Sequence, residues 1–196
     1  MYKFKVNDPK FLPHAGASLE LSLQNGTALV VTGSNGVGKS TLMRRFYQDF
    51  SDVSTLIDQT GLDYFYDRGL KRVKEIFLSA RKDEVKEELF FKLWERFGLT
   101  LKEERFQSTL SGGEGQLLKL VLGITIQSKI ILLDEPSHYL DEKMKEILNE
   151  VLEELMKEGR ALMLIEHDLS WIKFPFKGIL LEEREHQLQV VKTWNT

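Results

Sequence analysis

The sequence predicts an α/β fold built on a mainly parallel β-sheet. Short apolar runs typical of buried strands recur along the chain, at 27–32, 53–57, 130–133 and 161–165. Between them lie segments whose apolar residues return at helical spacing, and strands that alternate with helices form parallel sheets. The chain has 196 residues, 42% hydrophobic and 29% charged, which is the size and composition of one globular domain. We expect that domain to span residues 1–196.

The first part of the chain combines an expected hairpin with a strand, loop, helix and strand unit. Residues Leu19 to Leu23 alternate apolar and polar side chains, and Asn25-Gly26 is a turn signal before the run 27–32. This pattern predicts a hairpin that leads into a buried strand. After a glycine-rich loop, apolar residues from Leu42 to Phe50 recur at helical spacing, and a further apolar run restores a strand.

The middle of the chain is predicted to be a helical insertion into this fold. From about residue 63 to residue 107 the pattern is helical and rich in charges and aromatics. We expect the aromatic side chains to be core residues, namely Phe90, Phe91, Trp94 and Phe97. The domain then divides into a core of about 1–60 and 115–196 and a helical subdomain of about 61–114.

The last part returns to strands and one strongly amphipathic helix. The strand 130–133 ends in Asp134-Glu135-Pro136, and the apolar stripe of the next helix runs from Met144 to Met156. Gly159 is placed as the C-terminal stop of that helix. After the strand 161–165, two final runs at 178–181 and 188–191 predict a terminal strand pair.

Composition removes several classes of function. The formal net charge of −3 and the pI near 5.9 offer no overall reason for nucleic-acid binding, and none is expected. The chain has no cysteine, so a disulfide framework and a thiolate metal site are both excluded. No signal peptide is evident, and no apolar run approaches the roughly 20 residues that span a bilayer. A cytoplasmic location is the default expectation.

The segment GSNGVGKS predicts a phosphate-binding loop between a strand and a helix. Its glycines let backbone N–H groups surround phosphates at a helix N-terminus, whose dipole favours anions. Lys39 adds a charge for the β- and γ-phosphates, Ser40 can offer its hydroxyl to Mg²⁺, and Thr41 begins the helix. The expected nucleotide-binding residues here are Gly33, Ser34, Asn35, Gly36, Val37, Gly38, Lys39, Ser40 and Thr41.

Two further motifs could take part in nucleotide chemistry, one through its carboxylates and the other by binding an anion. Asp134 and Glu135 end a strand, where Asp134 suits a Mg²⁺ site and Glu135 suits a base that polarises water. Pro136 is expected to bias Glu135 toward extended backbone. In LSGGE, Ser111 and Glu114 fit a capping box, and Gly112 and Gly113 add exposed N–H groups that make a second anion site.

These motifs resemble the nucleotide-binding domain of the ATP-binding cassette (ABC) family, as found in ABC transporter ATP-binding proteins. The segments GSNGVGKST, LSGGE, IILLDEP, SHYLD and LIEHD occur in the family order and at suitable spacing over nearly the whole chain. The resemblance implies a P-loop NTPase core with a helical subdomain insertion and a reduced antiparallel β region. It also implies Mg-dependent ATP hydrolysis by a head-to-tail dimer, formed with itself or with a paralogous cassette.

The resemblance assigns roles to individual residues. In such a dimer, Ser111, Gly112, Gly113 and Glu114 would face the γ-phosphate of the ATP bound to the partner's phosphate loop. Gln59 matches the family's glutamine near Mg²⁺ and the attacking water, and His167 matches its switch histidine. Phe11 is the best-placed candidate for adenine stacking, with Tyr2 and Phe4 as rivals. Asp141 matches the interface loop and also suits a helix N-cap.

The chain departs from the family pattern at two places. Lys39 and Gln59 lie only about twenty positions apart, which shortens the region that usually holds adenine contacts, and Leu117 replaces a usual basic residue.

The leading hypothesis for the function is an ATPase that energises a separate integral-membrane permease and is peripheral on the cytoplasmic face of the membrane. The alternatives are a soluble cassette that acts on ribosomes, DNA or an assembly complex, and a cassette that binds ATP without hydrolysing it.

Overall fold

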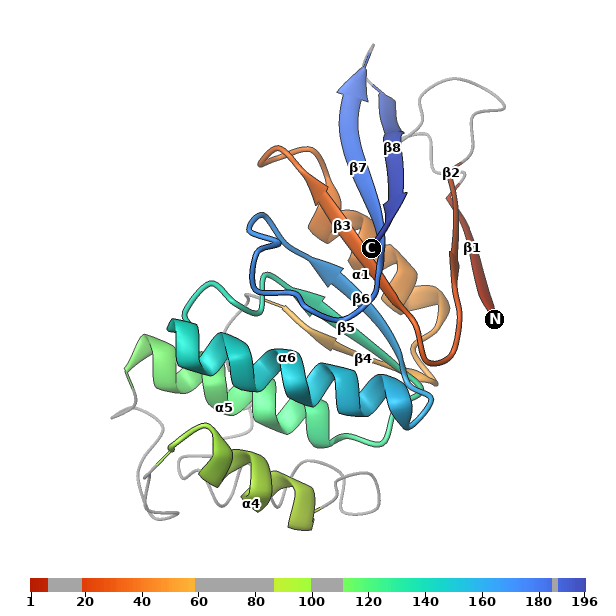
Figure 1. Cartoon of the computed structure of the whole chain (residues 1–196). Coiled ribbons are helices and arrows are strands. Elements are labelled where there is room, and N and C mark those ends of the chain that lie inside the picture. The colour runs from red at the N-terminus through yellow and green to blue at the C-terminus, as the bar shows by residue number, and fades with distance from the viewer. Residues whose placement is uncertain (7–18, 59–86, 100–110, 185–186) are drawn as a thin grey trace, which may run out of the picture.

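The computed structural model describes residues 1–6, 19–58, 87–99, 111–184 and 187–196, and Figure 1 shows their arrangement. The helices within these ranges are α1 (Lys39–Asp49), α4 (Glu87–Arg96), α5 (Gly112–Thr125) and α6 (Glu142–Lys157). The strands are β1 (Tyr2–Val6), β2 (Leu19–Leu23), β3 (Ala28–Gly33), β4 (Ser54–Ile57), β5 (Ile130–Asp134), β6 (Ala161–Ile165), β7 (Lys177–Arg184) and β8 (Gln187–Asn195).

The main sheet confirms the predicted mainly parallel α/β fold. Its six strands lie in the order β4-β5-β6-β3-β7-β8, and every pair except β7 with β8 is parallel. The antiparallel partners β7 and β8 are the predicted terminal strand pair. Because the parallel strands point the same way, the loops after β3, β4, β5 and β6 leave from one edge of the sheet, where ligands bind in open α/β sheets.

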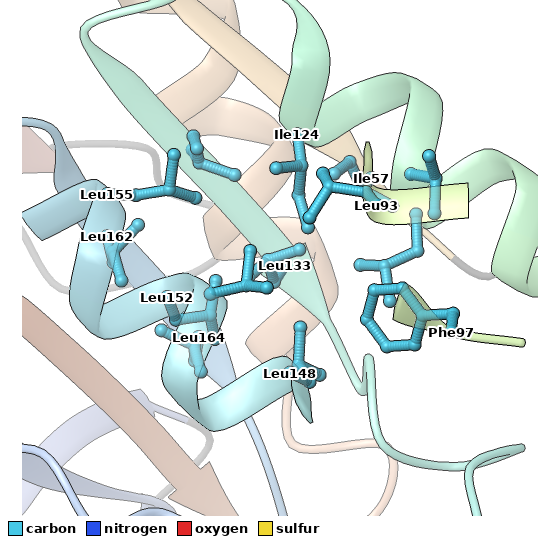
Figure 2. Close-up of a cluster of buried hydrophobic side chains, with 14 of the residues drawn as sticks. Ile57, Leu93, Phe97, Ile124, Leu133, Leu148, Leu152, Leu155, Leu162 and Leu164 are labelled. Atoms are coloured by element: carbon cyan, nitrogen blue, oxygen red, sulfur yellow. The ribbon is translucent and has the colours of Figure 1, made fainter. Parts of the chain in front are cut away.

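The alternation of side chains along each strand divides the core between the two faces of this sheet. Ile131 and Leu133 of β5 point toward α5 and α6, and Figure 2 shows Leu133 among leucines of α6 and β6. Ile130 and Leu132 point the other way, toward α1 and the β1–β2 pair. Burying each such side chain contributes roughly 1.5–3 kcal/mol, so both helical layers are held firmly to the sheet.

The predicted hairpin between Leu19–Leu23 and the next strand is wrong. β2 pairs with β1 in a separate two-stranded sheet, whereas β3 is paired on both sides, by β6 and by β7. The Asn25-Gly26 turn exists, with Gly26 at a φ of 72° and its N–H bonded to the Arg160 carbonyl at 3.1 Å. The turn carries the chain from one sheet to the other, because β3 has no free edge for β2.

The aromatic residues of α4 mostly behave as predicted. Phe90 and Phe97 are 2% exposed and Trp94 is 9% exposed, so these three belong to the core. Phe91, at 39% exposed, does not, because it lies about 100° around the helix from Phe90, at the margin of the buried face, where its ring meets Phe90 edge to face. Arg96 at the end of α4 pairs with Glu150 and Glu154 of α6 at 2.6 and 3.1 Å. Of the two boundaries proposed for the helical subdomain, residue 60 lies outside the described residues and residue 115 lies within α5.

Two predicted helix ends have the geometry that their sequences indicate. The Asp141 carboxylate accepts the N–H of Met144 at 2.8 Å and caps α6, and Gly159 follows the helix with a φ of 90°. None of the helices within the described ranges combines the length and apolar character needed to span a bilayer.

Candidate functional site

The glycine-rich loop leaves β3 and enters α1 as predicted, and its shape explains its glycines. Gly33 has a φ of 151°, and a Cβ there would lie 2.4 Å from the backbone oxygen of Leu181 on the neighbouring strand. Gly36 and Gly38 have φ values of 79° and 105°, the left-handed region in which glycine carries no steric penalty. Gly38 is the N-cap of α1, so backbone N–H groups at the helix start remain available to an anion.

Side chains of the loop divide between the core and the binding face. Val37 packs into the core beneath the loop, at 9% exposed, so only its backbone can contribute to a nucleotide site. Ser34, Asn35, Gly36 and Thr41 are exposed. The loop is therefore anchored from below by Val37 and open above.

Lys39 lies within the loop rather than in solvent. Its Nζ donates to the carbonyl oxygens of Gly33 at 2.8 Å and Ser34 at 3.0 Å, and the residue is only 5% exposed. Burial lowers the pKa of Lys39, and the nearby carboxylates of Glu135 and Asp134 oppose that shift. The ammonium is thus held at the centre of the loop, where a phosphate would meet it.

Asp134 and Ser40, the two residues expected to hold Mg²⁺, lie within hydrogen-bond distance of each other. The Ser40 hydroxyl donates to the Asp134 carboxylate, although burial raises the pKa of Asp134 overall. Oδ1 of Asp134 is buried and has no hydrogen-bond partner among the described residues. A buried carboxylate oxygen that lacks a partner beside a hydroxyl is a donor set that suits Mg²⁺, a cation that prefers oxygen ligands.

Glu135 meets His167, the residue that follows β6 by two positions. His167 Nε2 lies 3.2 Å from Glu135 Oε1, with the side chains 42% and 22% exposed. The expectation of extended backbone at Glu135 is wrong, because its φ is 51°. The N–H of Glu135 donates to the Ile165 carbonyl at 2.9 Å, and the chain then turns so that the His138 N–H reaches the Glu135 carbonyl at 3.2 Å. These bonds impose a left-handed conformation that proline alone would disfavour.

The LSGGE turn forms the predicted capping box at the start of α5. The Ser111 hydroxyl accepts the N–H of Glu114 at 3.3 Å, and the Glu114 carboxylate accepts the N–H of Ser111 at 2.7 Å. Ser111 is exposed, and Gly113 lies near the Tyr139 backbone of the SHYLD loop. The geometry fits both the capping role and an anion site that faces outward.

Two predicted residues lie outside the described residues. Phe11, the candidate for adenine stacking, falls in 7–18, and Gln59 falls in 59–86. Asp58 is the last described residue before Gln59, and it lines a small pocket with Asp134, Glu135 and Tyr139. Asp58 therefore lies beside the two carboxylates that end β5.

Sequence reasoning missed an ion-pair cluster around Asp58. Arg44 of α1 reaches Asp58 Oδ2 at 3.2 Å, and Lys119 of α5 reaches Asp58 Oδ1 at 3.3 Å and also donates to the Asp58 carbonyl. Asp58 and Lys119 side chains are only 15% and 13% exposed. The cluster ties the phosphate-loop helix and the LSGGE helix to the end of β4. The three residues are far apart in the sequence, so no local motif predicts the cluster.

Lys119→Met is expected to destabilise the fold by about 1–3 kcal/mol, because it removes one of the two cations that the described residues place beside the largely buried Asp58. Asp58→Asn should cost a similar amount, and the double variant should cost less than the sum by about 1 kcal/mol. Urea unfolding followed by circular dichroism measures all three. Strictly additive losses would show that the pair does not interact.

The profile of the ABC transporter family matches residues 17–138, which is more than half of the chain. The chain belongs to the ABC transporter family. It is therefore an ABC ATP-binding cassette, an ATPase that binds and hydrolyses ATP. All the motifs from the phosphate loop to SHYLD lie inside or at the end of the matched segment.

Curated relatives of the cassette are ATP-binding proteins. A putative ABC transporter ATP-binding protein of Treponema denticola is 26% identical over 87% of this chain and 40% of that protein. The glutamine transport ATP-binding protein GlnQ of Geobacillus stearothermophilus is 28% identical over 87% of this chain and 84% of that protein. The cassette thus spans less than half of the first relative and most of the second.

Solved structures confirm the fold. A dimeric bacterial ABC transporter cassette aligns with a TM-score of 0.69 and 17% identity, over 90% of this chain and 88% of that one. An archaeal ribosome recycling factor, aABCE1, aligns with a TM-score of 0.70 and 18% identity, over 88% of this chain and 39% of that one. At these identities the likeness establishes the P-loop NTPase fold and nothing finer.

Proposed function

We propose that the cassette hydrolyses ATP in a head-to-tail dimer and thereby energises a separate membrane permease. The observation that supports the dimer is that one chain presents two helix N-termini of the kind that can bind anions, at Gly38 and at Ser111. The phosphate loop holds Lys39 at its centre, while the capped start of α5 presents Ser111 outward on a different element. A head-to-tail pair brings the second site of one protomer to the first site of the other. The dimeric cassette among its structural neighbours supports the same assembly.

Mg²⁺ is the cofactor that the site would take with ATP. Ser40 and Asp134 would hold it, since the buried Asp134 Oδ1 lacks a hydrogen-bond partner within the described residues, and Gln59 would complete the set. When bound, the ion would neutralise charge on the β- and γ-phosphates. Lys39 would supply the second positive charge from within the loop.

Hydrolysis at this site needs a base and a group that orients it. Glu135 accepts a proton from the attacking water while the water oxygen bonds to the γ-phosphorus and ADP departs. His167 lies within hydrogen-bond distance of Glu135 and holds its carboxylate near the phosphate loop. Ser111 and Gly113 of the partner would donate to the γ-phosphate and exclude water from the closed site.

Transport is the role favoured by the relatives that this chain matches along most of their length. The glutamine and glutamate transport ATP-binding proteins each align over 84% or 85% of their length, so the cassette matches nearly the whole of such a subunit. In this role the cassette would work at the cytoplasmic face of a membrane, docked to an integral-membrane permease. Its dimer partner would be a second copy or a paralogous cassette.

A ribosome-directed role is the second candidate, and the likeness to the archaeal ribosome recycling factor favours it. The cassette covers only 39% of that chain, so the comparison omits most of the larger protein. One experiment separates the two roles. The Glu135→Gln cassette, loaded with ATP, is mixed with native membranes and with ribosomes, and each mixture is centrifuged. Selective recovery with membranes supports transport, and selective recovery with ribosomes would overturn it.

A further inference from the structure

Glu166 is a buried carboxylate for which the hydrolysis scheme has no use. It follows the last residue of β6, directly precedes His167, and is only 3% exposed. Carboxylates are rarely buried to this extent unless hydrogen bonds or ion pairs compensate the lost hydration. The partners of Glu166 therefore indicate what it does.

The donors to Glu166 come from two different loops. Its Oε1 accepts the backbone N–H of Ser137 at 3.1 Å, and the Ser137 hydroxyl and the backbone N–H of His167 also donate to the carboxylate. Ser137 belongs to the loop after β5, and His167 belongs to the loop after β6. Burial raises the pKa of Glu166, and these three donors oppose that shift because they favour the ionised form.

Each of these loops carries one member of the Glu135–His167 pair. Glu135 precedes Ser137 by two positions, and His167 Nε2 lies 3.2 Å from Glu135 Oε1. Glu135 also has the left-handed φ of 51°, which costs on the order of 1 kcal/mol or more and persists only where surrounding contacts enforce it. The hydrogen bonds of Glu166 join the two loops next to the strained Glu135. They therefore fix the position of the Glu135 side chain relative to His167.

The anchor points of Glu166 make this bridge rigid. Its own N–H donates to the Val31 carbonyl of β3 at 3.2 Å, and the Glu135 N–H donates to the Ile165 carbonyl at 2.9 Å. The bridge is thus tied to the central strand that leads into the phosphate loop. Within the described part of the chain, the other charged groups that face Glu166 are the Glu135 carboxylate and Lys145 of α6, and Lys145 is bonded to Glu142 at 2.8 Å.

We propose that Glu166 is a positioning residue for hydrolysis: it bridges the loops after β5 and β6 and so holds Glu135 and His167 in register with the phosphate loop. This inference rests on the proposed roles of Glu135 and His167. Glu166 acts through them, by its hydrogen bonds to Ser137 and His167.

Glu166→Gln tests the proposal with a nearly isosteric change. The amide NH₂ group cannot accept a hydrogen bond. One of the two carboxylate oxygens that now accept hydrogen bonds from Ser137 and His167 is therefore replaced by a donor, and the bridge between the loops is weakened. A displacement of about 1 Å at a catalytic group can cost 10²-fold in rate, and we expect kcat for ATP to fall by about 10- to 100-fold with KM within about twofold. Glu146→Gln, the same change on the exposed face of α6, should leave kcat unchanged.

A cycle with His167→Ala distinguishes positioning from general damage. If Glu166 acts through the pair, Glu166→Gln combined with His167→Ala should be slowed by clearly less than the product of the two single losses, because part of the Glu166 effect passes through His167. Multiplying losses, or a parallel loss of ATP-analogue affinity and melting temperature in Glu166→Gln, would overturn the proposal. An unchanged kcat in Glu166→Gln would also overturn it. If Glu135→Gln itself keeps full activity, the hydrolysis scheme fails instead, so the two failures are distinguishable.

Discussion

Glu135→Gln is expected to lower ATP turnover by about 10²- to 10⁴-fold, the contribution of a positioned general base, while ATP binding persists. The amide keeps the volume of the carboxylate but cannot accept the water proton. It can still receive a hydrogen bond from His167, whose Nε2 lies 3.2 Å from Glu135 Oε1, so the local fold should survive. Phosphate release under saturating Mg-ATP measures the loss.

The same variant should accumulate the closed dimer. Since ATP is retained between the phosphate loop and the partner's LSGGE turn, light scattering should show a mass near twice the 22.7 kDa of the chain. Glu142→Gln is the matched control, because Glu142 lies on the exposed first turn of α6. A Glu135→Gln cassette that stays monomeric with excess ATP would contradict the head-to-tail mechanism, and one that hydrolyses ATP at the wild-type rate would contradict the role of the base.

Lys39→Met is expected to weaken ATP binding by about 10- to 100-fold. The variant removes a charge-assisted hydrogen bond to phosphate, worth roughly 1.5–3 kcal/mol, and keeps the buried aliphatic stem. It also leaves the Gly33 and Ser34 carbonyls without the ammonium that now holds them at 2.8 and 3.0 Å. We therefore expect a second, smaller effect, namely a loop that is less well ordered before nucleotide arrives.

Fluorescence titration with a labelled ATP analogue measures the affinity of Lys39→Met. Arg45→Met serves as control, because Arg45 is on the same helix, half exposed, and contacts only its own helix, with Asp49 at 4.0 Å and Gln48 at 3.3 Å among the described residues. Unchanged affinity in Lys39→Met would show that the ammonium belongs to the loop's structure and not to the phosphate site. Equal losses in both variants would point to a general effect of charge on α1.

Local motifs predicted much of the site, because their geometry is set by neighbours in sequence. The strand, glycine loop and helix around Gly33–Ser40, the capping box at Ser111 and the Asp141 cap all depend on contacts within a few residues. The hairpin was predicted wrongly for the opposite reason. Asn25-Gly26 is a turn, but the pairing of β2 depends on β6 and β7, which arrive more than a hundred residues later.

The backbone of Glu135 is a similar case. Proline at the next position favours extended geometry, yet bonds to Ile165 and between His138 and Glu135 impose a φ of 51°. A pattern of neighbouring residues cannot predict the hydrogen bond from Glu135 to Ile165, which lies on a strand thirty positions away. The same holds for Asp58, which two cations from α1 and α5 reach, and for Glu166.

The sequence by itself determined which chemical groups this cassette has: a glycine loop with Lys39 and Ser40, the carboxylates of Asp134 and Glu135, His167 and an LSGGE turn. Backbone flexibility, capping and charge are properties of short segments, so a linear motif can encode them. Only the tertiary structure decided how these groups meet. The parallel sheet brings the ends of β3, β5 and β6 to one edge, where Lys39 is buried, Asp134 lacks a partner for Oδ1 among the described residues, and Glu166 bridges the loops of the base and the histidine. Burial and long-range hydrogen bonding arise from packing between distant segments, and no single segment specifies them.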